Sequence, residues 1–254
     1  MLNRIINLSK EAGKILSEGY NKQDCLISYK GKVDLVTETD LKCEKFIADY
    51  IKRNFPEDTV LAEENNSITG TNNRVWIIDP LDGTTNFSHK YPFFAVSIAL
   101  QIDGEIRFGA VFNPVLNELF YAEKGKGAFL NDKKISVSST KDISKSLIAT
   151  GFPYDRWENG DLYLEEMKKF VKQCLGVRRE GSAAIDLCYV ACGRLDGYFE
   201  RKLKPWDMAA GQLIVLEAGG KISTYENDTW NINSHSIIAD NQKIHKIIID
   251  LLSS

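Results

Sequence analysis

The stretch WIIDPLDGTTNF, residues 76–87, leads an apolar run directly into two carboxylates. The apolar residues before Asp79 predict a buried strand that delivers this carboxylate to the end of a sheet. A proline keeps Asp79 extended, and Gly83 permits a tight turn after which Asp82 points back the same way. The two carboxylates are therefore expected to lie close together.

Two close carboxylates are costly unless something compensates their charge. At an effective dielectric constant near 20, two charges about 4 Å apart repel by on the order of 4 kcal/mol. Such a pair takes up a proton or binds a cation, and oxygen ligands, which here include the carbonyl of Leu81, suit Mg²⁺, Mn²⁺ or Ca²⁺. With three histidines and no C-x-x-C pair, a zinc site is not expected. Residues from Gly83 onward are expected to begin a helical turn whose free N–H groups favour an anion.

Two more acidic positions fit the same idea. Glu63 and Glu64 follow a short apolar run, and Asp207 lies in the first turn of an otherwise apolar helix. Considered alone, each has an ordinary explanation: a solvated loop for the glutamates, and an interaction with the helix dipole for Asp207. The sequence around the first aspartate pair is far more restrictive than either.

Hydrophobic periodicity predicts a layered α/β fold, with helices and mixed sheets in alternating layers. The expected helices are 2–19, one with Asp40 as its N-cap that ends at Phe55, 161–174, 182–192, 206–218, and a last one from about Asp240 or Asn241. The expected strands are 75–78, 94–102, 106–113, 118–122, a hairpin over 128–137 with its turn at Asn131-Asp132, 147–150, 197–200, 221–224 and 236–239. A Ser/Lys-rich stretch, 136–146, is the predicted boundary. It divides the chain into halves of residues 1–140 and 141–254, with the active site between them.

The overall composition excludes several classes of protein. The net charge of −3 provides no global basic field for nucleic acid or anionic lipid, and no apolar run approaches the length of a membrane span. The N-terminal residues form an amphipathic pattern rather than a signal peptide. The five cysteines are scattered and odd in number, which predicts reduced thiols in a cytoplasmic protein.

Two separated motifs in the right order identify a family. W-x-x-D-P-x-D-G-T-x-N begins at Trp76, and W-D-x-A-A-G begins at Trp206; segments 33–40 and 181–187 add to them. With these motifs the chain resembles the inositol monophosphatase family, in its bacterial branch, over nearly its whole length. The resemblance implies the layered sandwich of inositol monophosphatase and fructose bisphosphatase, a lithium-sensitive Mg²⁺-dependent phosphatase, and a homodimer.

The resemblance also implies a role for each matching residue. The implied ligands for two or three Mg²⁺ ions are Glu63, Asp79, the Leu81 carbonyl, Asp82 and Asp207. The implied catalytic residues are Thr84, which positions the attacking water, Asp40, which supports it, and Glu63. The implied substrate contacts are Gly83 and Thr84 for the phosphate, the turn Gly181, Ser182 and Ala183, and Glu200 for sugar hydroxyls. Lys30 and Asp34 match a loop associated with a weaker third metal. Ala62 and Lys32 depart from the family pattern, and neither change removes a ligand.

The expected reaction is hydrolysis of inositol 1-phosphate, or a similar polyol or sugar phosphate, by metal-activated water. Metal ions reverse the sign of a carboxylate-lined pocket that would otherwise repel phosphate. No Ser, Cys or His constellation competes as nucleophile. Fructose bisphosphate, histidinol phosphate, a 3′-nucleotide and NADP stay open as alternative substrates, as does a further role as a binding partner of the transcription machinery. Arg178 and Arg179 are candidates either for phosphate binding or for ion pairs.

Overall fold

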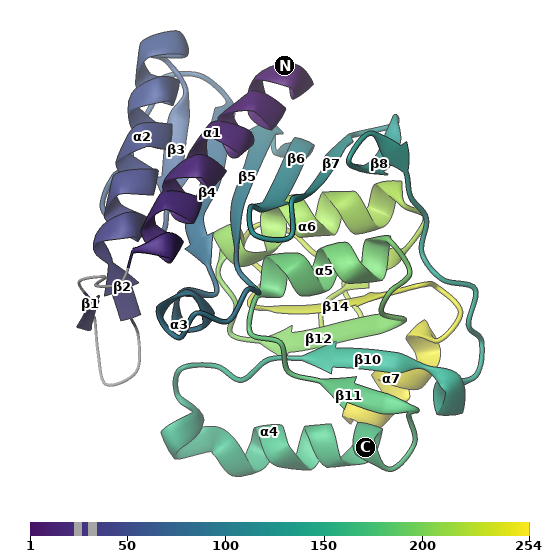
Figure 1. The fold of residues 1–254 in the computed structure, drawn as a ribbon. Helices are drawn as coiled ribbons and strands as arrows, with labels where there is room; N and C mark the ends of the chain where they lie inside the picture. Colours follow the sequence, from purple (N-terminus) through teal and green to yellow (C-terminus); the bar gives the residue numbers. More distant parts are fainter. Residues whose placement is uncertain (23–26, 30–34, 254) are drawn as a thin grey trace.

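A computed structural model describes residues 1–22, 27–29 and 35–253 of the chain. Two sheets and three pairs of helices are stacked in five layers (Figure 1). Helices α1 and α2 cover one face of the first sheet, α5 and α6 fill the space between the sheets, and α4 and α7 cover the far face of the second sheet. The predicted layered α/β architecture is confirmed.

The first sheet is a seven-stranded meander with one parallel strand at its edge. Its strands lie side by side in sequence order: β3 (Thr59–Ala62), β4 (Arg74–Asp82), β5 (Ala95–Ile102), β6 (Glu105–Asn113), β7 (Glu118–Glu123), β8 (Gly127–Leu130) and β9 (Lys133–Lys134). Only β3 pairs in parallel, with β4. The hairpin turn at Asn131-Asp132 is confirmed, and both residues have the positive φ that such two-residue turns require.

The second sheet has five strands in the order β11-β10-β12-β14-β13. Their bounds are β10 (Leu147–Thr150), β11 (Gly176–Arg178), β12 (Gly197–Arg201), β13 (Lys221–Ser223) and β14 (Ser236–Asp240). The short edge strand β11 was not expected from the sequence. A separate two-stranded pair joins β1 (Ile27–Tyr29) to β2 (Leu35–Thr37). The proposed division at residue 140 falls between β9 and β10, and it stays a prediction.

The helices are α1 (Leu2–Asn21), α2 (Glu38–Asn54), α3 (Thr84–Ser88), α4 (Arg156–Val171), α5 (Ala183–Ala191), α6 (Pro205–Glu217) and α7 (His245–Ser253), with a 3-10 turn η1 (Ile143–Lys145). None of the helices in the described part of the chain is long and apolar enough to span a bilayer.

Three predicted helix starts are wrong. The N-cap of α2 is Thr37, not Asp40: the Thr37 hydroxyl accepts the N–H of Asp40, and the Asp40 carboxylate accepts the N–H of Thr37. This is a capping box, which needs an acceptor side chain at the third helical position. Helix α4 begins five residues before the predicted start. Helix α7 begins at His245, because Asp240 ends β14 and Gln242 takes a left-handed conformation (φ 67°).

Helix α6 is apolar on nearly all sides because it lies between the two sheets. A Cβ at Gly109 of β6 would come within 3.0 Å of the Ala210 backbone, so this glycine lets α6 approach the first sheet closely. Gly211 likewise leaves room for the Leu187 side chain, so α5 packs closely against another side of α6. The close packing sets the depth at which the N-terminal end of α6 presents Asp207.

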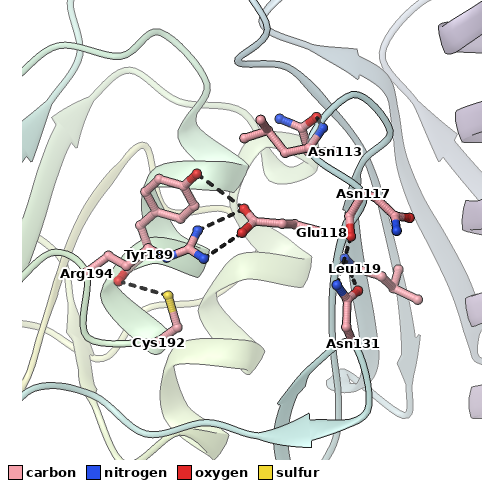
Figure 2. Close-up of polar contacts among 9 residues, drawn as sticks. Asn113, Asn117, Glu118, Leu119, Asn131, Tyr189, Cys192 and Arg194 are labelled. Atoms are coloured by element: carbon pink, nitrogen blue, oxygen red, sulfur yellow. Dashed lines mark hydrogen bonds and ion pairs between the residues drawn. The ribbon is translucent and has the colours of Figure 1, made fainter.

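An ion pair joins the first sheet to the segment that follows α5 (Figure 2). The Arg194 guanidinium donates to both carboxylate oxygens of Glu118, at 2.8 and 2.5 Å, and stacks over the Tyr189 ring. The Tyr189 hydroxyl donates to the same carboxylate at 3.3 Å. This contact holds the start of β7 against the second half of the chain.

Candidate active site

A cavity of about 480 Å³ lies where the two halves of the chain meet. Its walls come from the end of β4, the first turn of α3, the N-terminal ends of α5 and α6, and the loop between β10 and α4. The lining includes most of the residues that the motifs single out: Glu63, Asp79, Leu81, Asp82, Gly83, Thr84, Gly181, Ser182, Ala183, Glu200 and Asp207. Lys30 and Asp34 lie outside the described residues, so their part in a third-metal loop stays a prediction.

Asp79 and Asp82 face the same cavity because β4 is irregular between them. In a regular strand, residues three apart point to opposite faces. Here Asp79 pairs with Ser97 and Asp82 with Ala95, so β4 advances by three residues while β5 advances by two. This bulge turns the second carboxylate to the side of the first. The strand thus runs through Asp82, where the sequence had suggested a tight turn.

The other two carboxylates reach the cavity by different routes. Strand β3 pairs in parallel with β4, so the chain leaves both strands at the same sheet edge and carries Glu63 to the side of Asp79. Asp207 lies in the first turn of α6, where its Oδ2 accepts the N–H of Lys204 at 2.7 Å. Asp207 therefore has both of the roles considered for it, because it caps the helix and lines the cavity.

The buried carboxylates raise one another's pKa values. Burial raises the pKa of Asp79 well above its usual value, and the nearby charges of Glu63, Asp82 and Asp207 raise it further. Burial and the charge of Asp82 likewise raise the pKa of Asp207. Burial raises the pKa of Asp82 to about 6, even though Ser182 and the amides at the start of α5 favour its ionised form. The described residues offer these aspartates no ion pair.

The donor set suits a hard cation. It consists of carboxylates and one carbonyl, the ligands that Mg²⁺ prefers. Asp82 Oδ2 accepts from the Ser182 hydroxyl and the Ala184 amide, and Asp207 Oδ2 accepts from the Lys204 amide. No three acidic, histidine or cysteine side chains in the described ranges are already gathered around one point. A metal ion would therefore draw these side chains together rather than enter a finished cage.

Thr84 lies beside the carboxylates at the start of α3. Its Oγ1 is 3.0 Å from the carbonyl of Leu81 and 3.2 Å from Oδ1 of Asp40. Asp40 is fully buried, and burial raises its pKa to about 6. Gly83 precedes the helix with a φ of 90°, and a Cβ there would press against the carbonyls of Phe93 and Gly181 at 3.0 and 3.2 Å. Only glycine fits this left-handed junction comfortably.

Glu200 and Ser182 line the same cavity as the aspartates. Glu200 at the end of β12 lines the cavity, accepts the Tyr198 hydroxyl, and has a pKa that burial raises to about 7. A Cβ at Gly151 would overlap the Glu200 carboxylate, so this position needs glycine. Ser182 caps α5 and donates to Asp82 at 2.6 Å, which links the turn at residues 181–183 to the carboxylates.

The sequence analysis missed Glu44. Its fully buried carboxylate accepts the backbone N–H groups of Glu64 and Asn65 at 2.7 Å and of Asn66 at 2.9 Å. It thereby fixes the turn that presents Glu63. The available signal was a lone glutamate on the apolar stripe of α2, between Cys43 and Ile47. A charged residue there needs buried partners, but the partners are unknown without the fold.

Comparison with known proteins gives concordant findings. The model of the inositol monophosphatase family matches residues 1–254. The "Inositol-1-monophosphatase" of Rhizobium meliloti is 41% identical over 254 residues, covering 99% of this chain and 96% of that protein. The "Nus factor SuhB" of Escherichia coli K12 is 41% identical over 251 residues, covering 98% of this chain and 94% of that protein.

Solved structures agree with these sequence matches. The extragenic suppressor protein suhB from Bartonella henselae has a TM-score of 0.95 and 41% identity, with 99% of this chain and 98% of that chain covered. The inositol monophosphatase from Anabaena has a TM-score of 0.88 and 40% identity, with 99% and 96% covered.

Proposed function

Because the chain belongs to the inositol monophosphatase family, it is a phosphatase, and we propose that it hydrolyses inositol 1-phosphate or a similar polyol phosphate. The observation that carries the proposal is the convergence of Asp79, Asp82 and Asp207 on one cavity that Glu200 also lines, with no described residue forming an ion pair with these three aspartates. The carboxylates suit the cations that a phosphate dianion needs, and Glu200 suits the hydroxyl groups of a polyol.

In this proposal Glu63, Asp79, the Leu81 carbonyl, Asp82 and Asp207 hold two or three Mg²⁺ ions. When bound, these ions supply charge neutralisation for the phosphate and activation of a water molecule. The first turn of α3, which lines the cavity at Gly83 and Thr84, offers free N–H groups to the phosphate.

Thr84 and Asp40 orient the attacking water. The Thr84 hydroxyl lies within hydrogen-bond distance of Asp40, so Thr84 Oγ1 accepts a proton from the water while its own proton shifts toward Asp40 Oδ1. The water oxygen forms the new bond to phosphorus and the ester P–O bond breaks. The leaving oxygen takes up a proton from solvent water, and Asp40 returns its proton to solvent. Asp40 must be ionised for this role, because a protonated carboxyl group cannot take up the proton from Thr84.

The substrate's hydroxyl groups donate to Glu200. Tyr198 holds one of its oxygens in place, and the bare backbone of Gly151 leaves room for the carboxylate. The ionised form of Glu200 accepts from two hydroxyls at once, which favours a polyol over a leaving group without hydroxyls.

A panel of phosphate esters compared by kcat/KM tests the proposal. Inositol 1-phosphate is expected to be hydrolysed with Mg²⁺, not in excess EDTA, and less well with Li⁺. Full activity in EDTA would overturn the metal mechanism, and a non-polyol ester hydrolysed far faster than inositol 1-phosphate would overturn the role of Glu200.

The proposal includes a cytoplasmic homodimer. The described cysteines are free thiols, as expected in a reducing compartment.

Trp157, Leu164 and Val171 recur at seven-residue intervals along α4 and are 74%, 56% and 58% exposed. Such a stripe of apolar residues is typical of an interface. Sedimentation should give twice the chain mass, and Leu164→Glu should halve it, whereas Leu216→Glu on α6 serves as the matched exposed control.

A second role in transcription is also proposed, because a relative with 41% identity is named a Nus factor. Asp82→Asn separates the two roles. If this variant, inactive as a phosphatase, rescues a deletion strain, the partner role is supported; if only active protein rescues, it is rejected.

A further inference from the structure

Asn86 closes the first sequence motif, and the proposed function gives it no role. It lies in α3, and the described residues that line the cavity include Thr84 and Thr85 but not Asn86. Its side-chain amide donates to the carbonyl of Phe93 at 2.7 Å and to the carbonyl of Glu180 at 2.8 Å. An asparagine side chain has two N–H donors, and here both are used on backbone carbonyls. The bond to Glu180 spans 94 positions of the chain and joins its two halves.

Glu180 lies in the segment that leads into α5. Its neighbours on both sides, Arg179 and the turn at residues 181–183, line the cavity. Gly181 is left-handed (φ 89°), and a Cβ there would lie 3.2 Å from Nδ2 of Asn86. The backbone of this cavity wall therefore rests directly against the Asn86 amide.

Tyr91 fastens Glu180 a second time. The backbone N–H of Tyr91 donates to the Asn86 carbonyl at 2.9 Å, and its hydroxyl donates to the Glu180 carboxylate at 3.1 Å. Asn86 thus holds the backbone of Glu180, and Tyr91 holds its side chain. Because Tyr91 is 48% exposed, its hydroxyl can be removed without disturbing the core.

Helix α3 is anchored to the first half of the chain by contacts that do not use the Asn86 side chain. The Thr84 hydroxyl donates to the Leu81 carbonyl at 3.0 Å. The buried Phe87 ring packs edge-on against Phe94, with ring centres 5.0 Å apart. Loss of the Asn86 amide would therefore leave α3 in place and release the segment that leads into α5.

The two sides approach each other closely at Gly83. A Cβ there would lie 3.0 Å from the Phe93 carbonyl and 3.2 Å from the Gly181 carbonyl. The first turn of α3 and the turn at residues 181–183 are thus in contact, and Asn86 bonds to both flanks of that contact. The start of α5 is also tied to Asp82 through Ser182 and the next helical amides, so Asn86 orients the turn rather than attaching the helix.

We infer that Asn86 is a positioning residue that sets the orientation of the turn at residues 181–183 relative to the first turn of α3, and so aligns the leaving group with the phosphate. This inference rests on the proposed function, in which α3 receives the phosphate, and it assigns contact with the leaving group to the turn. A misplacement of about 1 Å can cost about a hundredfold in rate, even from a residue away from the chemistry. Asn86 therefore acts on catalysis without touching the substrate.

Two phosphate esters that differ in the leaving group test the inference at constant free Mg²⁺. Inositol 1-phosphate presents a polyol to the turn, whereas 4-nitrophenyl phosphate releases a stable phenolate that depends little on alignment. Asn86→Ala and Asn86→Leu both remove the amide donors, and the leucine keeps the volume. The ratio of the two kcat/KM values, inositol 1-phosphate over 4-nitrophenyl phosphate, should fall about tenfold in both variants, mainly through kcat.

Two further variants locate the effect. Tyr91→Phe removes only the second bond to Glu180 and should lower the ratio about twofold. Asn113→Ala is the matched control, because the Asn113 amide also donates to a carbonyl of the segment after α3, that of Pro92 at 3.1 Å, while its other bonds go to the turn after β6. It should lower the melting temperature and leave the ratio unchanged.

An unchanged ratio in both Asn86 variants, whether or not the two activities fall together, would limit Asn86 to a structural role. If these variants do not fold, an unchanged ratio in Tyr91→Phe overturns the inference. A wild-type protein that hydrolyses no inositol 1-phosphate would instead overturn the proposed function.

Discussion

Carboxylates lie at two places where the first sheet meets the second half of the chain, and within the described residues a cation neutralises them at only one of the two. Glu118 receives the forked guanidinium of Arg194 and the hydroxyl of Tyr189 (Figure 2). Asp79, Asp82 and Asp207 receive amide and hydroxyl donors but, within the described residues, no cation. The same type of side chain is thus paired with a cation at one place and left without a described cation at the other.

The difference separates structural from functional charge. A buried carboxylate costs folding free energy unless it is paired, so Glu118 with its arginine holds the two halves together. The aspartates at the cavity retain the cost, which appears as raised pKa values for Asp79 and Asp207. A cost that the chain leaves uncompensated is offset when cations bind from solution.

The largest expected effect comes from Asp82→Asn. The change removes one negative charge from the proposed metal site, and kcat at saturating inositol 1-phosphate should fall about a thousandfold, or about 4 kcal/mol. The amide oxygen can still accept from Ser182, so circular dichroism and the melting temperature without metal should be preserved. Wild-type kcat at low Mg²⁺ would remove Asp82 from the site.

The metal-free protein should lose stability as pH rises. Asp40 and Asp82 have pKa values of about 6 in the folded protein, above the usual 3.8, so the folded state holds these protons more tightly than the unfolded chain. Between pH 5 and 7.5 each group should lower the free energy of unfolding by about 1 kcal/mol. Urea titrations in EDTA measure this, and Mg²⁺ should restore stability at pH 7.5. A metal-free protein more stable at pH 7.5 than at pH 5 would contradict the assignment.

Glu118→Gln should affect stability and not catalysis. It removes the charge from a partly buried pair and should lower the free energy of unfolding by about 1 to 2 kcal/mol. Glu105→Gln, in an exposed pair with Lys124, is the matched control and should cost less than about 0.5 kcal/mol. If Glu118→Gln instead lowers kcat/KM without lowering stability, the contrast between the two groups fails.

Glu44→Gln should weaken metal binding through the turn that holds Glu63. The amide has one acceptor oxygen where the carboxylate has two, so some of the three backbone N–H groups lose their partner. Affinity for Mn²⁺, measured by calorimetry, should fall about tenfold, as for other residues that orient ligands. The exposed Glu57→Gln should leave it unchanged, and an unaltered affinity in Glu44→Gln would limit Glu44 to a structural role.

The prediction from sequence succeeded where the signal is local. Alternation and turn residues predicted the meander and its Asn131-Asp132 turn, because strand period and turn chemistry depend on near neighbours. It failed at the start of α2, where both Thr37 and Asp40 are residue types that cap helices. Only the hydrogen bonds between them show that Thr37 is the N-cap. It also failed at β11, a short edge strand whose pairing partner β10 lies far along the chain.

By itself, the sequence determined the family, the layered fold class and the oxygen-rich chemistry of the candidate site, because the motifs around Asp79 and Asp207 are written in consecutive residues. Only the tertiary structure decided how those residues meet. The bulge in β4 turns Asp82 toward Asp79, and Glu44 holds a turn some twenty positions away. These arrangements depend on contacts between distant parts of the chain, which no local pattern encodes.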